Sequence, residues 1–286
     1  MEQSKAIYFH NAYINADEKE LRRLWEEDAP QWLIKFYPAK YENDGTNYFL
    51  QHLEHKTLWL SSPVLFNDPF DSIINFDYRN QVGQWSKSIL ISLVGEKLAH
   101  EIMETEHAYK ALEKMKDRFQ CDMGAMHKLL EKSMYTACFA ERDNLKSLRM
   151  WGHYANCHAG VCAEYAFCDV NQATAFGCIP IKYDDTYEYC IDAVSIEEQV
   201  CNFMKLYTKS KEWQYEKEWR VSQKREDYSG TGYNIAFVQP KRVYLGCNVA
   251  ARLKNDVIHL CENQGIELYQ MTMRPSSFCL DIAEIK

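Results

Sequence analysis

Apolar residues along this 286-residue chain follow two different spacings. Short runs rich in β-branched and aromatic residues predict strands, whereas apolar residues three and four positions apart predict helices. The predicted strands span residues 57–61, 135–140, 160–167, 178–183, 215–222, 242–245, 266–273 and 279–285. The predicted helices span residues 17–29, 48–53, 86–120, 148–155, 195–207 and 249–263. This mixture indicates an α+β fold with a mixed, largely antiparallel sheet flanked by helices.

The long helical pattern after the first strand interrupts the strand-rich parts of the chain. It predicts a helical insertion at about residues 86–132, with apolar faces that include Leu93, Leu98 and Met115. No internal repeat and no low-complexity linker divides the sequence, so we expect a single domain over residues 1–286.

Capping residues support the helix boundaries. Asp17, with Glu20 three residues later, is typical of a helix N-terminus, and Pro30 ends that helix. Gly265 is expected to stop the helix at 249–263.

A loop bracketed by two prolines, SSPVLFNDPFD, follows the strand at 57–61. Each proline restricts the residue before it to extended geometry, so we expect a rigid loop. Asn67 and Asp68 are turn formers, and Phe66 and Phe70 are expected to point inward.

The composition, 47% hydrophobic and 26% charged, is that of a soluble globular protein. The net charge of −8 argues against an extended nucleic-acid surface, which needs a basic face. A local cluster of Lys205, Lys209 and Lys211 is interpreted as a solvated helix end. The sequence has no signal-peptide pattern and no apolar run approaching ~20 residues, so we expect a cytoplasmic protein without a membrane span.

The 11 cysteines form no Cys-x-x-Cys pair, and no metal site is predicted from them. A nucleophilic pair can be drawn from Cys138 and His153, or from Cys157 and His158. Cys138 lies in an apolar strand, however, where burial raises the pKa of a thiol and makes the thiolate scarce.

The predicted strand at 215–222, YEKEWRVS, carries two carboxylates on one face. Side chains alternate along a strand, so Glu216, Glu218, Arg220 and Ser222 share a face. The two carboxylates repel each other unless a cation or a hydroxyl group lies between them, such as an arginine, a ribose diol or a metal ion. The alternative is a solvated face on which Arg220 pairs with Glu218.

The stretch at 138–165 combines aromatic, acidic, amide and imidazole groups, which is typical of one wall of a functional cleft. Its loop from Glu141 to Asn144 directly follows a strand, where sites are common. In the next helix, His153 points away from the apolar face and could bind a ligand or a carboxylate. A structural histidine is the alternative.

Three blocks in combination carry a family resemblance. They are LWLSSPVLFNDPFD at 58–71, CFAERDNLKSLRMWGHYANCHAGVCAEY at 138–165 and EWQYEKEWRVS at 212–222, with VYLG at 243–246 after them. Together they resemble the bacterial domain of unknown function 2971, over about residues 35–250. Ala140 stands where that family usually has serine, which removes a hydroxyl group from the pattern.

The order of the blocks is also similar in outline to that of ADP-ribosyltransferases. The matching positions are Tyr37 or Lys40, then Ser61 and Ser62, then Glu216 and Glu218. This similarity implies an enzyme that transfers or hydrolyses at the ribosyl C1 of NAD, with NAD as a substrate and no cofactor firmly implied. Glu218 would then support an oxocarbenium-like transition state, and Glu216 would orient the acceptor. Trp151 or Tyr154 would stack on the base.

Two other functions stay open. One is a non-catalytic nucleotide- or protein-binding module in a bacterial defence or stress system. The other is a metal-dependent nuclease that holds Mg²⁺ through Asp68, Asp71, Glu164 and Glu216. The candidate catalytic residues are Glu216, Glu218, Glu141 and His153, and the candidate binding residues are Ser61, Ser62, Asn67, Asp68, Asn144, Trp151, Tyr154 and Arg220.

Overall fold

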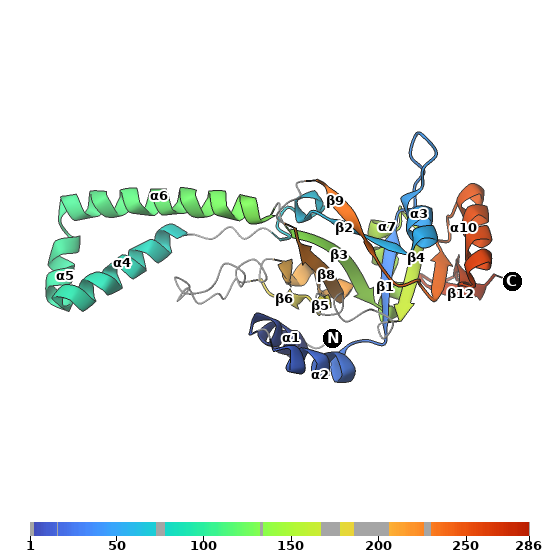
Figure 1. Cartoon of the computed structure of the whole chain (residues 1–286), viewed down its shortest axis with the longest axis horizontal. Coiled ribbons are helices and arrows are strands. Elements are labelled where there is room, and N and C mark those ends of the chain that lie inside the picture. Colours follow the sequence, from blue (N-terminus) through green and yellow to red (C-terminus); the bar gives the residue numbers. More distant parts are fainter. Residues whose placement is uncertain are drawn as a thin grey trace.

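A computed structural model describes residues 3–15, 17–72, 78–131, 134–166, 178–185, 206–225 and 230–285. It confirms the α+β class, with a large sheet and helices packed around it (Figure 1). The strands are β1 (Trp32–Tyr37), β2 (Thr57–Ser61), β3 (Met134–Glu141), β4 (Val161–Ala166), β5 (Cys178–Pro180), β6 (Lys182–Tyr183), β7 (Thr208–Lys209), β8 (Glu218–Lys224), β9 (Gly232–Ala236), β10 (Arg242–Leu245), β11 (Glu267–Met273) and β12 (Leu280–Glu284).

The helices match most of the apolar patterns in the sequence. They are α1 (Gln3–Ile14), α2 (Glu18–Asp28), α3 (Tyr48–His55), α4 (Tyr78–Val94), α5 (Glu96–Met103), α6 (Glu106–Glu131), α7 (Leu148–Tyr154) and α10 (Ala251–Gln264), with short 3₁₀ turns η1 (Pro63–Leu65), η2 (Arg142–Lys146) and η4 (Lys211–Glu216). The predicted caps are confirmed: Asp17 accepts a hydrogen bond from the Glu20 N–H, and Gly265 ends α10 in the left-handed conformation.

The large sheet runs in the order β12-β11-β10-β4-β1-β3-β2-β9, with β8 also paired to β3 and β5 to β8. In this described sheet, β10 and β11 pair in parallel and the other pairs are antiparallel. The prediction of a mixed, largely antiparallel sheet is therefore confirmed.

The sheet divides at β3. β8 pairs with β3 along its whole length, so the other edge of β3 is left for both β1 and β2. β1 pairs there only at Leu33 and Ile34, and β2 pairs only at Ser61 with Thr136. Between these two contacts none of the described strands pairs with this edge of β3, and an opening forms among the three strands.

Both faces of the sheet are covered. Along β1, Leu33 and Tyr37 belong to the larger apolar cluster, whereas Ile34 and Phe36 belong to a smaller one that includes α7. Helices α3 and α10 pack against each other beside the larger cluster. Because side chains alternate between the two faces of β1, this strand lies between the two apolar clusters.

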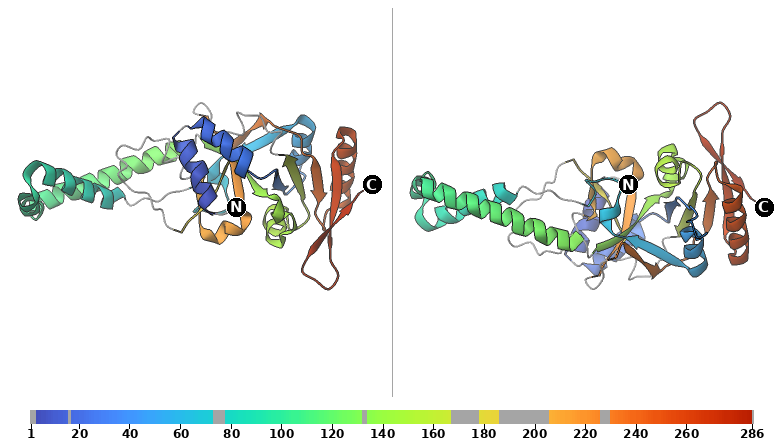
Figure 2. Two further views of the ribbon diagram at one scale, coloured as in Figure 1. Left: turned by 90° about the horizontal axis from the view of Figure 1, so that it is seen from below. Right: turned by 90° about the horizontal axis from the view of Figure 1, so that it is seen from above.

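Helices α4, α5 and α6 project from the body as an arm (Figures 1 and 2). Helices were expected over 86–120, and the observed helices extend over 78–131 apart from short turns. On the predicted apolar faces, Leu93 is 74% exposed and Leu98 and Met115 are also exposed.

Two further expectations need comment. The strand predicted at 215–222 is wrong in its first part, because η4 extends to Glu216 and β8 begins only at Glu218. The helix predicted at 195–207 lies almost wholly outside the described residues.

Candidate functional site

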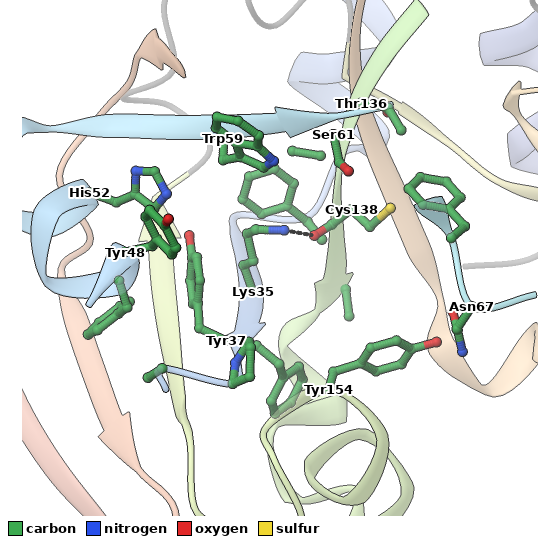
Figure 3. A pocket seen from close by; sticks show the side chains of 18 of the residues that line it. Lys35, Tyr37, Tyr48, His52, Trp59, Ser61, Asn67, Thr136, Cys138 and Tyr154 are labelled. Atoms are coloured by element: carbon green, nitrogen blue, oxygen red, sulfur yellow. Dashed lines mark hydrogen bonds between the residues drawn. The ribbon is translucent and has the colours of Figure 1, made fainter. Parts of the chain in front are cut away.

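A cavity of about 730 Å³ occupies the opening between β1, β2 and β3. Side chains from all three strands point into it, and α3, α7 and the loop after β2 close its sides (Figure 3). The cavity therefore exists because β1 and β2 share one edge of β3 without filling it.

The acidic end of the cavity is organised by Lys209. Its Nζ lies 2.6 Å from Glu216 Oε2, 3.0 Å from Glu218 Oε2 and 3.5 Å from Asp71 Oδ2. Arg220 continues the network with 2.7 Å to Glu218 and 2.6 Å to Asp71. All five side chains are buried, so these charges compensate one another away from water.

The backbone around residue 217 brings the two glutamates together. η4 ends at Glu216, and Lys217 adopts a left-handed conformation with φ of 46° before β8 begins. Asn144 donates to the Glu216 carbonyl at 2.6 Å, and the Tyr183 hydroxyl accepts from the Glu218 N–H at 2.8 Å. These contacts hold both carboxylates at the cavity although they do not share a strand face.

The pKa values of the two carboxyl groups are shifted in opposite directions. Burial, with the nearby charge of Glu218, raises the pKa of Glu216 to about 7. Burial also acts to raise the pKa of Glu218, but the charges of Arg220 and Lys209 outweigh it and hold that pKa well below its ordinary value. Tyr154 donates its hydroxyl to Glu216 Oε1 at 2.5 Å. Near neutral pH, Glu216 is thus the carboxyl that can exchange a proton.

The opposite end of the cavity is aromatic and carries a lysine. Tyr37, Tyr48, His52 and Trp59 surround this end together with Lys35 (Figure 3). Burial and the charge of Lys35 lower the pKa of His52 to about 4, so that its imidazole is neutral at pH 7. Rings and a cation lie at one end of the cavity, and carboxylates lie at the other.

Five of the predicted site residues line this cavity. They are Ser61, Asn67, Tyr154, Glu216 and Glu218. The interpretation of Arg220 as a partner of Glu218 is confirmed, but the strand face is buried rather than solvated, because Arg220 has no exposed surface.

The other predicted residues do not line the cavity. Trp151 is enclosed in the core, where its indole N–H donates to the Leu145 carbonyl at 2.7 Å. Glu141 accepts from the Trp219 indole at 3.4 Å, and His153 is exposed beside the rings of Tyr154 and Trp213. Stacking of a base on Trp151 is therefore excluded by its burial, which leaves Tyr154.

The proline-bracketed loop holds two more of them, Ser62 and Asp68. Asp68 accepts from the Phe70 N–H at 2.9 Å, as expected of a turn former, and Ser62 is buried. The inward orientation expected for Phe70 is wrong, because that ring is 77% exposed. Phe66, by contrast, lines the cavity and lies 5.2 Å from the Arg220 guanidinium. Asp71 turns inward to Arg220.

The four acidic residues proposed to hold Mg²⁺ do not converge. Glu164 forms ion pairs with Arg142 at 2.6 Å and Arg242 at 3.0 Å, and it accepts from Tyr244 at 2.9 Å. Within the described residues, no group of three or more histidines, cysteines, aspartates or glutamates is arranged to hold a metal ion. The Mg²⁺ grouping is therefore wrong.

Lys209, Asp71 and Lys35 line the cavity but were not among the candidate site residues. Lys209 was interpreted as part of a solvated helix end, Asp71 was considered only as a metal ligand, and Lys35 was not considered. The one signal for Lys35 is its place in the apolar run WLIKFY, because a lysine inside a buried strand needs a reason. Lys209 has no comparable signal, since its acidic partners are distant in sequence or in an unexpected turn.

No curated protein and no solved structure matches the chain, and neither comparison supports the outline similarity to ADP-ribosyltransferases. None of the helices in the described ranges is long and apolar enough to cross a membrane. Residues 150–221 match the model of a family described as protein of unknown function (DUF2971), which confirms the family resemblance over the segment that carries Glu216 and Glu218.

Proposed function

We propose that this protein binds a nucleotide-like small molecule in the cavity between β1, β2 and β3. The observation that carries the proposal is the division of the cavity into an aromatic end and a carboxylate end. Pockets of this size with aromatic walls and a few convergent polar groups are the usual sites for small molecules.

Each end suits one part of a nucleotide. The rings of Tyr48 and Trp59 offer flat apolar surfaces on which a base can stack. Glu216 and Glu218 supply carboxylate oxygens that can accept hydrogen bonds from ribose hydroxyls, because an ionised carboxylate has lone pairs beyond those used by Lys209.

A second candidate function is catalysis at the ribosyl C1 of NAD, and the raised pKa of Glu216 favours it. In this reaction the bond from C1 to the nicotinamide nitrogen breaks, and nicotinamide leaves with the electron pair. A water or another hydroxyl group attacks C1 and gives its proton to Glu216. Glu218, kept ionised by Arg220 and Lys209, would stabilise the positive charge on the sugar.

Titration calorimetry with NAD, ADP-ribose and AMP tests binding, and release of nicotinamide from labelled NAD tests catalysis. We expect Trp59→Ala to weaken binding about tenfold through loss of a stacking surface. Glu216→Gln should abolish nicotinamide release while it preserves the fold. Glu141→Gln is the control, because Glu141 lies outside the cavity.

The outcomes separate the two functions. Binding without turnover leaves a non-catalytic nucleotide-binding protein. Absence of binding for all three nucleotides contradicts both, and turnover that persists in Glu216→Gln contradicts the catalytic role of that residue.

A further inference from the structure

We propose that the ligand carries an anionic group of the phosphate class, which binds the Lys35 ammonium where β1 separates from β3. This inference rests on the proposed function and specifies the ligand: a nucleoside phosphate rather than a free nucleoside. It also assigns a binding role to a cavity residue that was not among the candidate site residues.

The first support is the place of Lys35 in the divided sheet. The register of β1 with β3 ends at Ile34, so Lys35 is the first residue of β1 beyond the paired region. Its Nζ reaches across the opening and donates to the Cys138 carbonyl at 3.1 Å (Figure 3). The Lys35 side chain thereby contacts the edge of β3. If β1 continued to pair with β3, backbone N–H groups of β1 would occupy this position.

The second support is that no anion of a described residue is paired with the Lys35 ammonium. Among the described residues, the Lys35 Nζ forms no ion pair with a carboxylate, and its other close neighbours are the rings of Tyr37 and Phe139, 5.4 and 5.6 Å away. The two buried cations near the carboxylates, Lys209 and Arg220, each contact at least two carboxylates. A half-buried ammonium without a paired anion is costly, and a bound anion would remove that cost.

The groups that face Lys35 do not supply an anion. Burial raises the pKa of the Cys138 thiol on β3, so that it stays neutral, and His52 on α3 is neutral at pH 7. Glu218 on β8 acts on Lys35 through space, but its own charge is taken up by Arg220 and Lys209. Burial lowers the pKa of Lys35, as expected of a cation that lacks a close partner.

A backbone donor adds to the site. In an antiparallel strand the N–H and C=O of one residue point to the same edge. The Cys138 carbonyl faces the opening, because it accepts from Lys35, and the Cys138 N–H therefore faces it too. An ammonium and an amide N–H beside an aromatic wall can bind a phosphate whose nucleoside stacks on the neighbouring rings.

Calorimetry with AMP and with uncharged adenosine tests the proposal on the full chain. Wild-type protein should bind AMP at least about tenfold more tightly than adenosine, as expected for a hydrogen-bonded charge pair. Lys35→Met should lower the affinity for AMP to about that for adenosine, and Lys35→Arg should restore part of the preference. Lys254→Met is the control, because Lys254 on α10 does not line the cavity. Thermal melts check that each variant is folded.

The results distinguish this inference from the proposed function. Equal affinity for AMP and adenosine overturns the phosphate subsite and leaves nucleoside binding intact, as does an AMP preference that survives in Lys35→Met. If neither compound binds, the proposed function fails. The subsite is then judged by acetylation of Lys35 at pH 8, measured by mass spectrometry with and without inorganic pyrophosphate. Several-fold protection at equal ionic strength supports it, and no protection overturns it.

Discussion

At the scale of single residues, Glu216 makes stability depend on pH. An unfolded glutamate titrates near 4.3, whereas in the folded protein the pKa of Glu216 is raised to about 7. The folded state therefore binds a proton between these values that the unfolded state does not. Its contribution is fully present below the unfolded pKa and is lost as pH rises through about 7.

We expect Glu216→Gln to reduce the decline of melting temperature between pH 5.5 and 8.5 relative to wild type, because glutamine cannot ionise. Melting curves recorded for both proteins across this range measure the effect. Identical slopes would mean that Glu216 titrates as it does in the unfolded chain.

Lys209 is expected to be the residue on which the buried charge network depends. Lys209→Met removes the cation that Glu216 contacts and leaves Glu218 and Asp71 with Arg220, and loss of one partner from a buried ion pair costs about 3–5 kcal/mol. Urea denaturation gives the change in the free energy of unfolding. Lys211→Met is the control, since its half-exposed side chain forms only long ion pairs, and a surface substitution of this kind changes stability by about 0.5 kcal/mol or less. Equal effects of the two substitutions would contradict this account.

Some residue roles could be predicted from sequence and others could not. The Arg220 and Glu218 pair was predicted because the two residues are two positions apart on a strand. Lys209 was not predicted, because its partner Asp71 is 138 residues away and Glu216 lies in a turn that the alternating pattern of YEKEWRVS conceals. The contribution of a buried charge depends on what surrounds it, and sequence spacing does not report that.

At the scale of elements, Gly160 joins α7 and β4 to the end of β1. A Cβ at this position would lie 2.2 Å from the Tyr37 carbonyl oxygen and 3.0 Å from the Ala155 backbone. Gly160→Ala is therefore expected to destabilise the protein by about 1–3 kcal/mol, as overpacking does. Because Tyr37 also lines the cavity, ligand affinity should fall as well.

Gly152 provides the comparison within α7. A Cβ there meets nothing within 4 Å, and alanine is favoured over glycine in a helix by up to about 1 kcal/mol. Denaturant unfolding should therefore show Gly152→Ala as neutral or stabilising. If both alanine variants behaved alike, the close approach at Gly160 would not limit the packing.

The strands could be predicted from the local sequence pattern, but the pairing of the strands could not. The boundaries of β2, β3, β4 and β10 agree with prediction to within two residues, because each is a compact run of strand-forming residues. The division of the sheet depends on where β1 and β2 stop pairing with β3, and these contacts join residues up to about a hundred positions apart. The cavity that results from this division was therefore not predictable from spacing.

At the scale of the whole molecule, the arm of α4 to α6 extends away from the sheet (Figure 2). The chain is held in the body on both sides of the arm. Before it, Ser72 accepts a hydrogen bond from Arg220 at 3.1 Å. After it, the Tyr135 hydroxyl donates to the Gly230 carbonyl at 3.2 Å. These anchors do not depend on helices that lie between them in sequence.

Replacement of residues 79–130 by a flexible glycine- and serine-rich linker should therefore leave the body folded. The free-energy cost of closing a loop rises only weakly with its length, by about 0.6 kcal/mol for each doubling. The change in melting temperature should therefore be small. Affinity for the ligand of the cavity should stay within about twofold of the full chain, because the arm supplies none of the cavity-lining residues. Calorimetric melting and ligand titration of the two proteins measure both quantities. Loss of the folded body, or loss of binding in a folded body, would instead show that the arm and the sheet form one cooperative unit, as a strict single-domain organisation requires.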